Sequence, residues 1–72
     1  MDKVSMTMDP VVIGERLRRL RGSRSQKEVA DALGVTTMAI SFYETGKRIP
    51  SDEMKLKIAN YYNRSVAFIF YK

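Results

Sequence analysis

The sequence predicts an all-α fold with five short helices in a chain of 72 residues. Ser, Thr or Asp precedes each expected helix, where a side-chain oxygen can accept from a free backbone N–H. Gly or Asn follows several of them, where a left-handed residue ends a helix at little steric cost. Between these signals, apolar residues recur three and four positions apart, as on one face of a helix. The length predicts one domain with a single small core.

The first helix is expected from Pro10 to about Arg21. Asp9 suits its N-cap, and proline suits the first helical position because its missing N–H would have no partner there. Residues 1–9 are expected to form a flexible segment, and residues 10–72 the folded domain. The core-facing side of this helix consists of Ile13, Leu17 and Leu20.

The second helix is expected to begin near Gln26. Ser25 suits its N-cap, and Glu28 is expected to reach back to Ser25 in a capping box. Gly34 then provides the left-handed residue that ends the helix. Its apolar face consists of Val29, Ala30 and Leu33.

The third helix is expected to follow a Thr36 N-cap and to end at Gly46. Its Ile40 and Tyr43 lie on one face and point back to the second helix. Two short helices joined by a tight glycine turn are typical of a helix-turn-helix, although helical hairpins of this kind also occur in proteins that do not bind DNA.

A fourth helix is expected after Ser51, because Pro50 forces the preceding residue into an extended conformation and Ser51 suits an N-cap. Asn63 closes this helix, and Ser65 opens a short fifth helix that runs from Val66 to about Tyr71. The inner face of the fourth helix is expected to contain Met54, Ile58, and Tyr61 or Tyr62.

Three segments resemble the Cro/C1-type helix-turn-helix domains (XRE family) of phage repressors and their bacterial relatives: SQKEVADALGV, AISFYETGKRIP with its YExGxxxP element and, more loosely, KIANYYNRSVAFIF. The resemblance covers about residues 10 to 70. It implies a compact five-helix, lambda-repressor-like fold and binding to operator DNA. Members usually have a longer stretch before the second helix, often ending in Gly-Leu. Here only Gly22, Ser23 and Arg24 intervene, so the end of the first helix or its loop is expected to be shortened.

The charge of the chain agrees with a polyanionic partner. It contains 13 Lys and Arg against 8 Asp and Glu, a net charge of +5. Clustered cations are typical of nucleic-acid binding, and the alternatives are an ordinary solvated helix face or a membrane-surface helix. The core needs the apolar face of the first helix, which disfavours the membrane. The clustered cations are Arg16, Arg18, Arg19, Arg21, Arg24 and Lys27.

Composition also excludes several function classes. The chain has no cysteine and no histidine, so a zinc finger and a His-dependent catalytic dyad are excluded. No pair of acidic residues suggests catalysis, so we expect no enzyme, cofactor, metal site or small-molecule ligand. The apolar runs are far shorter than the roughly 20 residues of a membrane helix, and no signal-peptide core is present. A cytoplasmic protein is expected.

The resemblance assigns base reading to four residues of the third helix. With Ile40 pointing inward, a rotation of about 100° per residue also places most of them outward. None is Arg, Asn or Gln, the side chains that make bidentate contacts to guanine or adenine. Apolar contact with thymine methyl groups is expected instead. The four residues are Thr37, Met38, Ser41 and Phe42.

Phosphate contacts are expected to flank these base readers. Gln26 lies at the N-terminus of the second helix, where backbone N–H groups favour an anion, and the resemblance gives Gln26 a phosphate contact. It also implies that Glu44 pairs with an arginine of the first helix as a structural tether. Alignment through LRRLR gives Arg21 as the partner, which we favour, and counting back from Gln26 gives Arg19. The full set of expected phosphate contacts is Gln26, Lys27, Arg24, Thr36, Lys47 and Arg48.

The apolar C-terminus supplies more hydrophobic surface than one short helix can readily bury. A homodimer on a palindromic operator is expected, because one recognition helix contacts only a few base pairs. The alternative for the tail is that Phe68 or Ile69 closes the monomer core. The alternative function is a protein-interaction module that uses Met38, Phe42 and the aromatic C-terminus. The candidate dimer residues are Val66, Phe68, Ile69, Phe70 and Tyr71.

Overall fold

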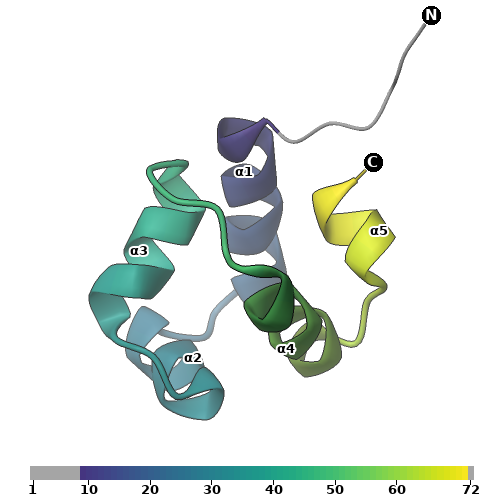
Figure 1. Ribbon diagram of the computed structural model, residues 1–72. Helices are drawn as coiled ribbons and strands as arrows, with labels where there is room; N and C mark the ends of the chain where they lie inside the picture. The colour runs from purple at the N-terminus through teal and green to yellow at the C-terminus, as the bar shows by residue number, and fades with distance from the viewer. Residues whose placement is uncertain (1–8, 72) are drawn as a thin grey trace, which may run out of the picture.

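The structure is a computed structural model that describes residues 9–71 (Figure 1). Within this range all regular structure is helical, which confirms the all-α fold. The expected flexible segment lies outside the described residues except for Asp9, which belongs to the first helix as its N-cap. The helices are α1 (Pro10–Arg21), α2 (Gln26–Leu33), α3 (Thr37–Thr45), α4 (Asp52–Tyr62) and α5 (Val66–Phe70).

Each helix begins at the side-chain cap that the sequence predicts. Asp9 Oδ1 accepts from the Val11 N–H at 2.9 Å. Equivalent bonds of 3.0 to 3.2 Å open the other four helices, with Ser25, Thr36, Ser51 and Ser65 as acceptors. These bonds satisfy backbone donors that would otherwise lack a partner. The helix starts are therefore determined locally.

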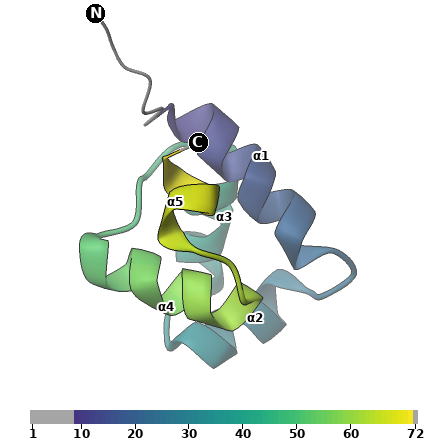
Figure 2. The same cartoon turned by 90° about the vertical axis from the view of Figure 1, so that its right-hand side faces the viewer.

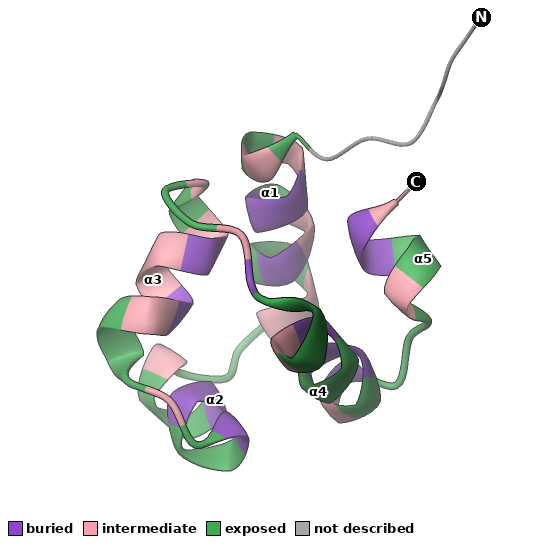
Figure 3. Cartoon of the chain, in the orientation of Figure 1, coloured by how far each residue is buried: buried purple, intermediate pink, exposed green. Residues whose placement is uncertain are grey.

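The core lies where the inner faces of all five helices meet (Figure 3). Ile13 and Leu17 of α1 lie within it, with Ile69 and Phe70 of α5 against them. Ile69 and Phe70 have no exposed surface, so their assignment to a dimer interface is wrong. A helix of only five residues can bury them because it folds back across α1 and α4 (Figure 2). Phe68, by contrast, remains exposed.

The backbones of α1 and α3 approach closely at Gly14. A Cβ added at Gly14 would clash with the backbone carbonyl oxygens of Tyr43 and Glu44. Only glycine fits at this crossing, because any side chain would push α3 outward. Gly14 therefore determines how closely the third helix sits on the first.

The inner face of α4 differs in part from the sequence-based expectation. Ile58 and Tyr62 are buried as expected, whereas Tyr61 is half-buried. Lys55 is also buried, with 5% of its surface exposed. Its Nζ donates to the Tyr71 hydroxyl at 3.0 Å and lies 3.5 Å from an Asp52 carboxylate oxygen, and the resulting hydrogen bonds raise the pKa of Lys55.

Within the described residues, no helix combines the length and apolar character needed to cross a bilayer.

Candidate nucleic-acid interface

The turn between α2 and α3 fixes the relative placement of the two helices. Gly34 adopts a left-handed conformation with φ of 73°, and its N–H bonds to carbonyl oxygens at the end of α2. The Val35 N–H donates to the Ala30 carbonyl at 3.0 Å, so the chain turns back at once. Ala30 is 1% exposed, and its small side chain lets the two helices pack closely.

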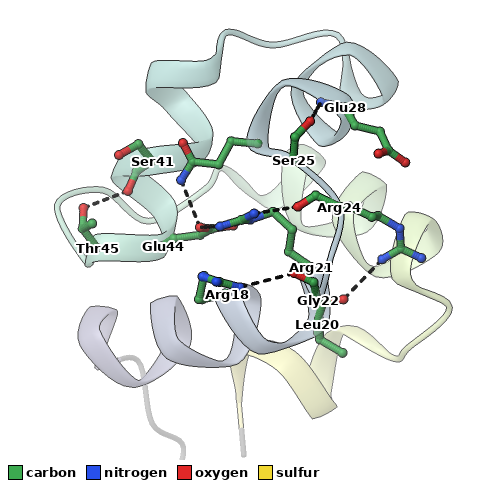
Figure 4. Close-up of polar contacts among 11 residues, drawn as sticks. Arg18, Leu20, Arg21, Gly22, Arg24, Ser25, Glu28, Ser41, Glu44 and Thr45 are labelled. Atoms are coloured by element: carbon green, nitrogen blue, oxygen red, sulfur yellow. Dashed lines mark hydrogen bonds and ion pairs between the residues drawn. The ribbon is translucent and has the colours of Figure 1, made fainter.

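The N-terminus of α2 is capped from one side only. The Ser25 hydroxyl accepts from the Glu28 backbone N–H at 3.0 Å. The Glu28 carboxylate points away from Ser25 into solvent (Figure 4), so the reciprocal half of the expected capping box is not formed. Negative charge in the first turn still suits the helix dipole.

The four expected base readers lie on the outer face of α3, and their side chains are exposed to solvent to different extents. Thr37 is exposed, and Met38 has 65% of its surface exposed. Ser41 and Phe42 are half-buried, so Phe42 offers less than a full ring to a partner. At the far end of the helix, the Thr45 hydroxyl donates to the Ser41 carbonyl at 2.8 Å, which removes Thr45 as a free donor.

Glu44 pairs with Arg21 rather than with Arg19. The Arg21 Nε and Nη2 atoms donate to the two carboxylate oxygens at 2.7 and 3.1 Å, in a bidentate geometry (Figure 4). The Arg21 and Glu44 side chains are only 11% and 6% exposed. The hydrogen bond to Glu44 raises the pKa of Arg21 against the opposing effect of burial. The pair joins the C-terminal ends of α1 and α3.

Gln26 belongs to the same network. Its Nε2 donates to Glu44 Oε1 at 3.1 Å, so the carboxylate holds the amide between the N-terminus of α2 and the C-terminal end of α3. A side-chain amide nitrogen has two N–H groups, and the second can donate to a phosphate. No local sequence pattern predicts this contact, because 18 positions separate the two residues.

The expected phosphate contacts separate into three groups. Lys47 and Arg48 are exposed in the loop that follows α3, and both of their backbone N–H groups bond to the Phe42 carbonyl. Thr36 is exposed, and its side chain caps α3. Lys27 forms an exposed ion pair with Asp31 at 2.9 Å.

Arg24 does not lie with the other expected phosphate contacts. Its guanidinium lies over the rings of Tyr61 and Tyr62, 5.3 and 5.6 Å from their centroids, and donates to the Leu20 carbonyl. The short loop after α1 directs this side chain toward α4. The basic residues that are neighbours in sequence therefore do not form one continuous face.

The described residues contain no group of three or more side chains suited to hold a metal ion.

Comparisons with known proteins agree with this geometry. A family model described as helix-turn-helix matches residues 16–69. The SPbeta prophage-derived uncharacterized HTH-type transcriptional regulator YonR of Bacillus subtilis (strain 168) is 37% identical over 60 residues. The match covers 81% of this chain and 56% of that protein, so the chain spans about half of the relative's length.

Solved structures show the same arrangement of helices. The restriction-modification controller protein C.AhdI from Aeromonas hydrophila has a TM-score of 0.78 at 30% identity, over 89% of this chain and 100% of that one. The clp gene regulator ClgR from C. glutamicum has a TM-score of 0.74 at 25% identity, over 88% and 84% of the two chains. The SOS-response transcriptional repressor LexA from Eubacterium rectale, at 19% identity and a TM-score of 0.81 over 93% and 73%, shows a shared fold.

The family model covers most of the chain, and the related proteins are gene regulators rather than enzymes. The chain belongs to the helix-turn-helix family, and within it to the Cro/C1 type.

Proposed function

We propose that this chain is a transcriptional regulator, most simply a repressor, that binds double-stranded DNA with α3 in the major groove. The observation that carries the proposal is the placement of polar and cationic groups around α3. Gln26 is held beside the C-terminal end of α3 by Glu44, and Lys47 and Arg48 follow that end directly. Phosphate contacts beside the C-terminal end of a helix with an exposed outer face would position that face over base edges. Such a regulator works in the cytoplasm.

The exposed face of α3 supports readout by shape and apolar contact. Met38 has 65% of its surface exposed and can pack against thymine methyl groups. Thr37 and Ser41 supply hydroxyl groups, which hydrogen-bond to either donors or acceptors. The proposed half-site therefore contains thymine.

The proposal includes a homodimer on a palindromic operator, with half-sites about 34 to 36 Å apart along the DNA. Since Ile69 and Phe70 are buried in the monomer, the candidate dimer contact narrows to the residues of the tail that keep exposed surface. Of these, Val66 and Tyr71 are assigned to the dimer contact, because the exposed Phe68 lines a separate groove with Arg64.

Fluorescence anisotropy with duplexes selected from a random pool tests the proposal. If about four to six phosphates are neutralised, the logarithm of the binding constant falls with log salt at a slope of about −4 to −5. Lys47→Ala removes one phosphate contact per protomer and is expected to make that slope shallower by about 1.8 for a dimer. Lys57→Ala is the matched control, because Lys57 lies beside Ala32 and Leu33 at the other end of α2 from Gln26.

An enriched palindrome together with this change in slope supports the regulator. If no sequence is enriched and Lys47→Ala matches Lys57→Ala, the proposal is wrong. The alternative is then a protein-interaction module, and the exposed Met38 side chain is the feature that favours it. A pull-down with the Phe42→Ala variant as control would test that alternative.

A further inference from the structure

A second basic surface lies between α1 and α5. It is a groove of about 510 Å³, within the size range of ligand-binding clefts. Among the described residues, its lining combines three guanidinium groups with two apolar side chains and includes no acidic residue. The lining residues are Arg16, Arg19, Leu20, Arg64 and Phe68.

This groove faces away from the recognition helix. Gly14 marks the side of α1 that touches α3. At about 100° per residue, Arg16 is rotated about 200° from Gly14, and Arg19 about 140°. Figure 2 shows the same relation, with α5 in front and α3 behind. A duplex bound to α3 therefore does not reach the arginines of this groove.

The groove is built by contacts within the fold. The Arg16 Nη1 atom donates to the Ile69 carbonyl at 2.9 Å, which joins α1 to the buried end of α5. Phe68 is 44% exposed, and the Arg64 guanidinium lies over its ring, 5.9 Å from the centroid. Leu20 is half-buried and also lines the groove. Cationic and apolar groups thus lie within one cleft.

We infer that this groove binds an acidic peptide segment of another protein, one that carries a large apolar side chain among its carboxylates. Arginine pairs with carboxylates in a bidentate geometry, which selects an acidic ligand. Leu20 and the exposed part of the Phe68 ring select an apolar side chain in the same segment. The groove provides a docking surface on the face of the regulator opposite the DNA.

A second copy of this chain fits the groove poorly. A two-fold contact places the same patch of both copies face to face, so three arginines would meet three arginines. The dimer contact proposed above is accordingly left to Val66 and Tyr71. A single-stranded nucleic acid would stack its bases on an aromatic face, whereas Arg64 already covers a face of the Phe68 ring.

The probe is a fluorescein-labelled peptide of alternating Asp and Glu with a central Trp-Leu pair. A charge-matched peptide with Gly-Gly in place of Trp-Leu tests the apolar part of the groove. Anisotropy is measured with the full chain and with Arg19→Glu, Arg64→Glu and Phe68→Ala, whose side chains are exposed. Lys57→Glu is the matched charge reversal outside the groove, and helical circular dichroism verifies that each variant is folded.

We expect Arg19→Glu and Arg64→Glu each to weaken peptide binding about tenfold or more, since each removes a charge-assisted hydrogen bond. Phe68→Ala and the Gly-Gly peptide are each expected to weaken it about fivefold. Lys57→Glu is expected to change it less than twofold. Binding of the random-sequence duplex by Phe68→Ala should equal that of the unchanged chain.

Four results would overturn the inference. The first is that the Trp-Leu peptide does not bind. The second is that Arg19→Glu and Lys57→Glu weaken peptide binding equally, which would show that binding depends only on the net charge of the chain. The third is that single-stranded RNA binds the chain more tightly than the Trp-Leu peptide does and that Arg19→Glu abolishes this RNA binding. That result would assign the groove to a nucleic acid. The fourth is self-association that Phe68→Ala abolishes, which would assign it to a second copy.

Discussion

Breaking the Arg21–Glu44 pair is expected to remove most of the stability of the domain. Two unit charges about 4 Å apart attract by about 4 kcal/mol at an effective dielectric constant of about 20. Both side chains are nearly excluded from water, at 11% and 6% exposure. Among the described residues, Arg21→Met would leave the Glu44 carboxylate with Gln26 as its remaining side-chain donor. The loss of one buried partner costs about 3 to 5 kcal/mol, and a core of this size supplies about the same.

Urea unfolding followed by circular dichroism tests this expectation, with trimethylamine N-oxide present so that weak variants remain measurable. Arg21→Met and Glu44→Met are expected to unfold at the lowest urea concentrations. The double variant is expected to lose less than the sum of the single losses, because no unpaired charge remains.

The exposed Lys27–Asp31 pair is the matched control. Its atoms are 2.9 Å apart, close to the 2.7 Å of the buried pair, but its side chains are 78% and 67% exposed. Substitution of either member by Met is expected to cost about 0.5 kcal/mol or less. Equal losses at the two pairs, or additive losses within the buried pair, would refute the reasoning from burial.

Three further predictions concern the core. Gly14→Ala is expected to lower the melting temperature even though alanine favours helix, because the added Cβ meets the backbone of α3. A higher melting temperature would contradict that packing. Lys55→Met is expected to leave the free energy of unfolding within about 1 kcal/mol, since an apolar side chain replaces a buried charge; a loss in urea unfolding as large as that of Arg21→Met would show that the charge itself is needed. Burial raises the pKa of Tyr62 from 10.0 to about 12. The folded state therefore holds that proton more tightly than the unfolded state, and about 2 to 3 kcal/mol of stability present below pH 10 is lost as the pH rises to about 12. Tyr62→Phe should lack this loss in alkaline urea titrations and Tyr61→Phe should retain it, and identical curves for all three proteins would refute the assignment.

The helix boundaries could be predicted from the sequence because they depend on near neighbours. Ser25, Thr36, Ser51 and Ser65 each accept from an N–H three residues along the chain. The left-handed residues that stop α2, α3 and α4 are likewise determined within one turn. Only the end of α5 differs, since that helix stops at Phe70 rather than at about Tyr71.

The directions of long side chains could not be predicted in the same way. Arg24 lies on Tyr61 and Tyr62 because the loop after Gly22, with φ of 60° and ψ of −128°, turns toward α4. For Lys55 a signal was present, since it lies three residues before the buried Ile58 on the same helical face. The usual exposure of lysine outweighed that spacing.

The contact between Arg21, Glu44 and Gln26 ties the stability of the fold to the proposed DNA contact. Arg21 holds the carboxylate, and the carboxylate holds the amide that would meet a phosphate. Loss of Arg21 would lower the fraction of folded chains. The apparent affinity for DNA would fall in the same proportion, but no phosphate contact of the folded chain would be removed. Loss of Lys47 would instead change the salt dependence itself. The salt slope therefore separates residues that touch DNA from residues that hold the interface in shape.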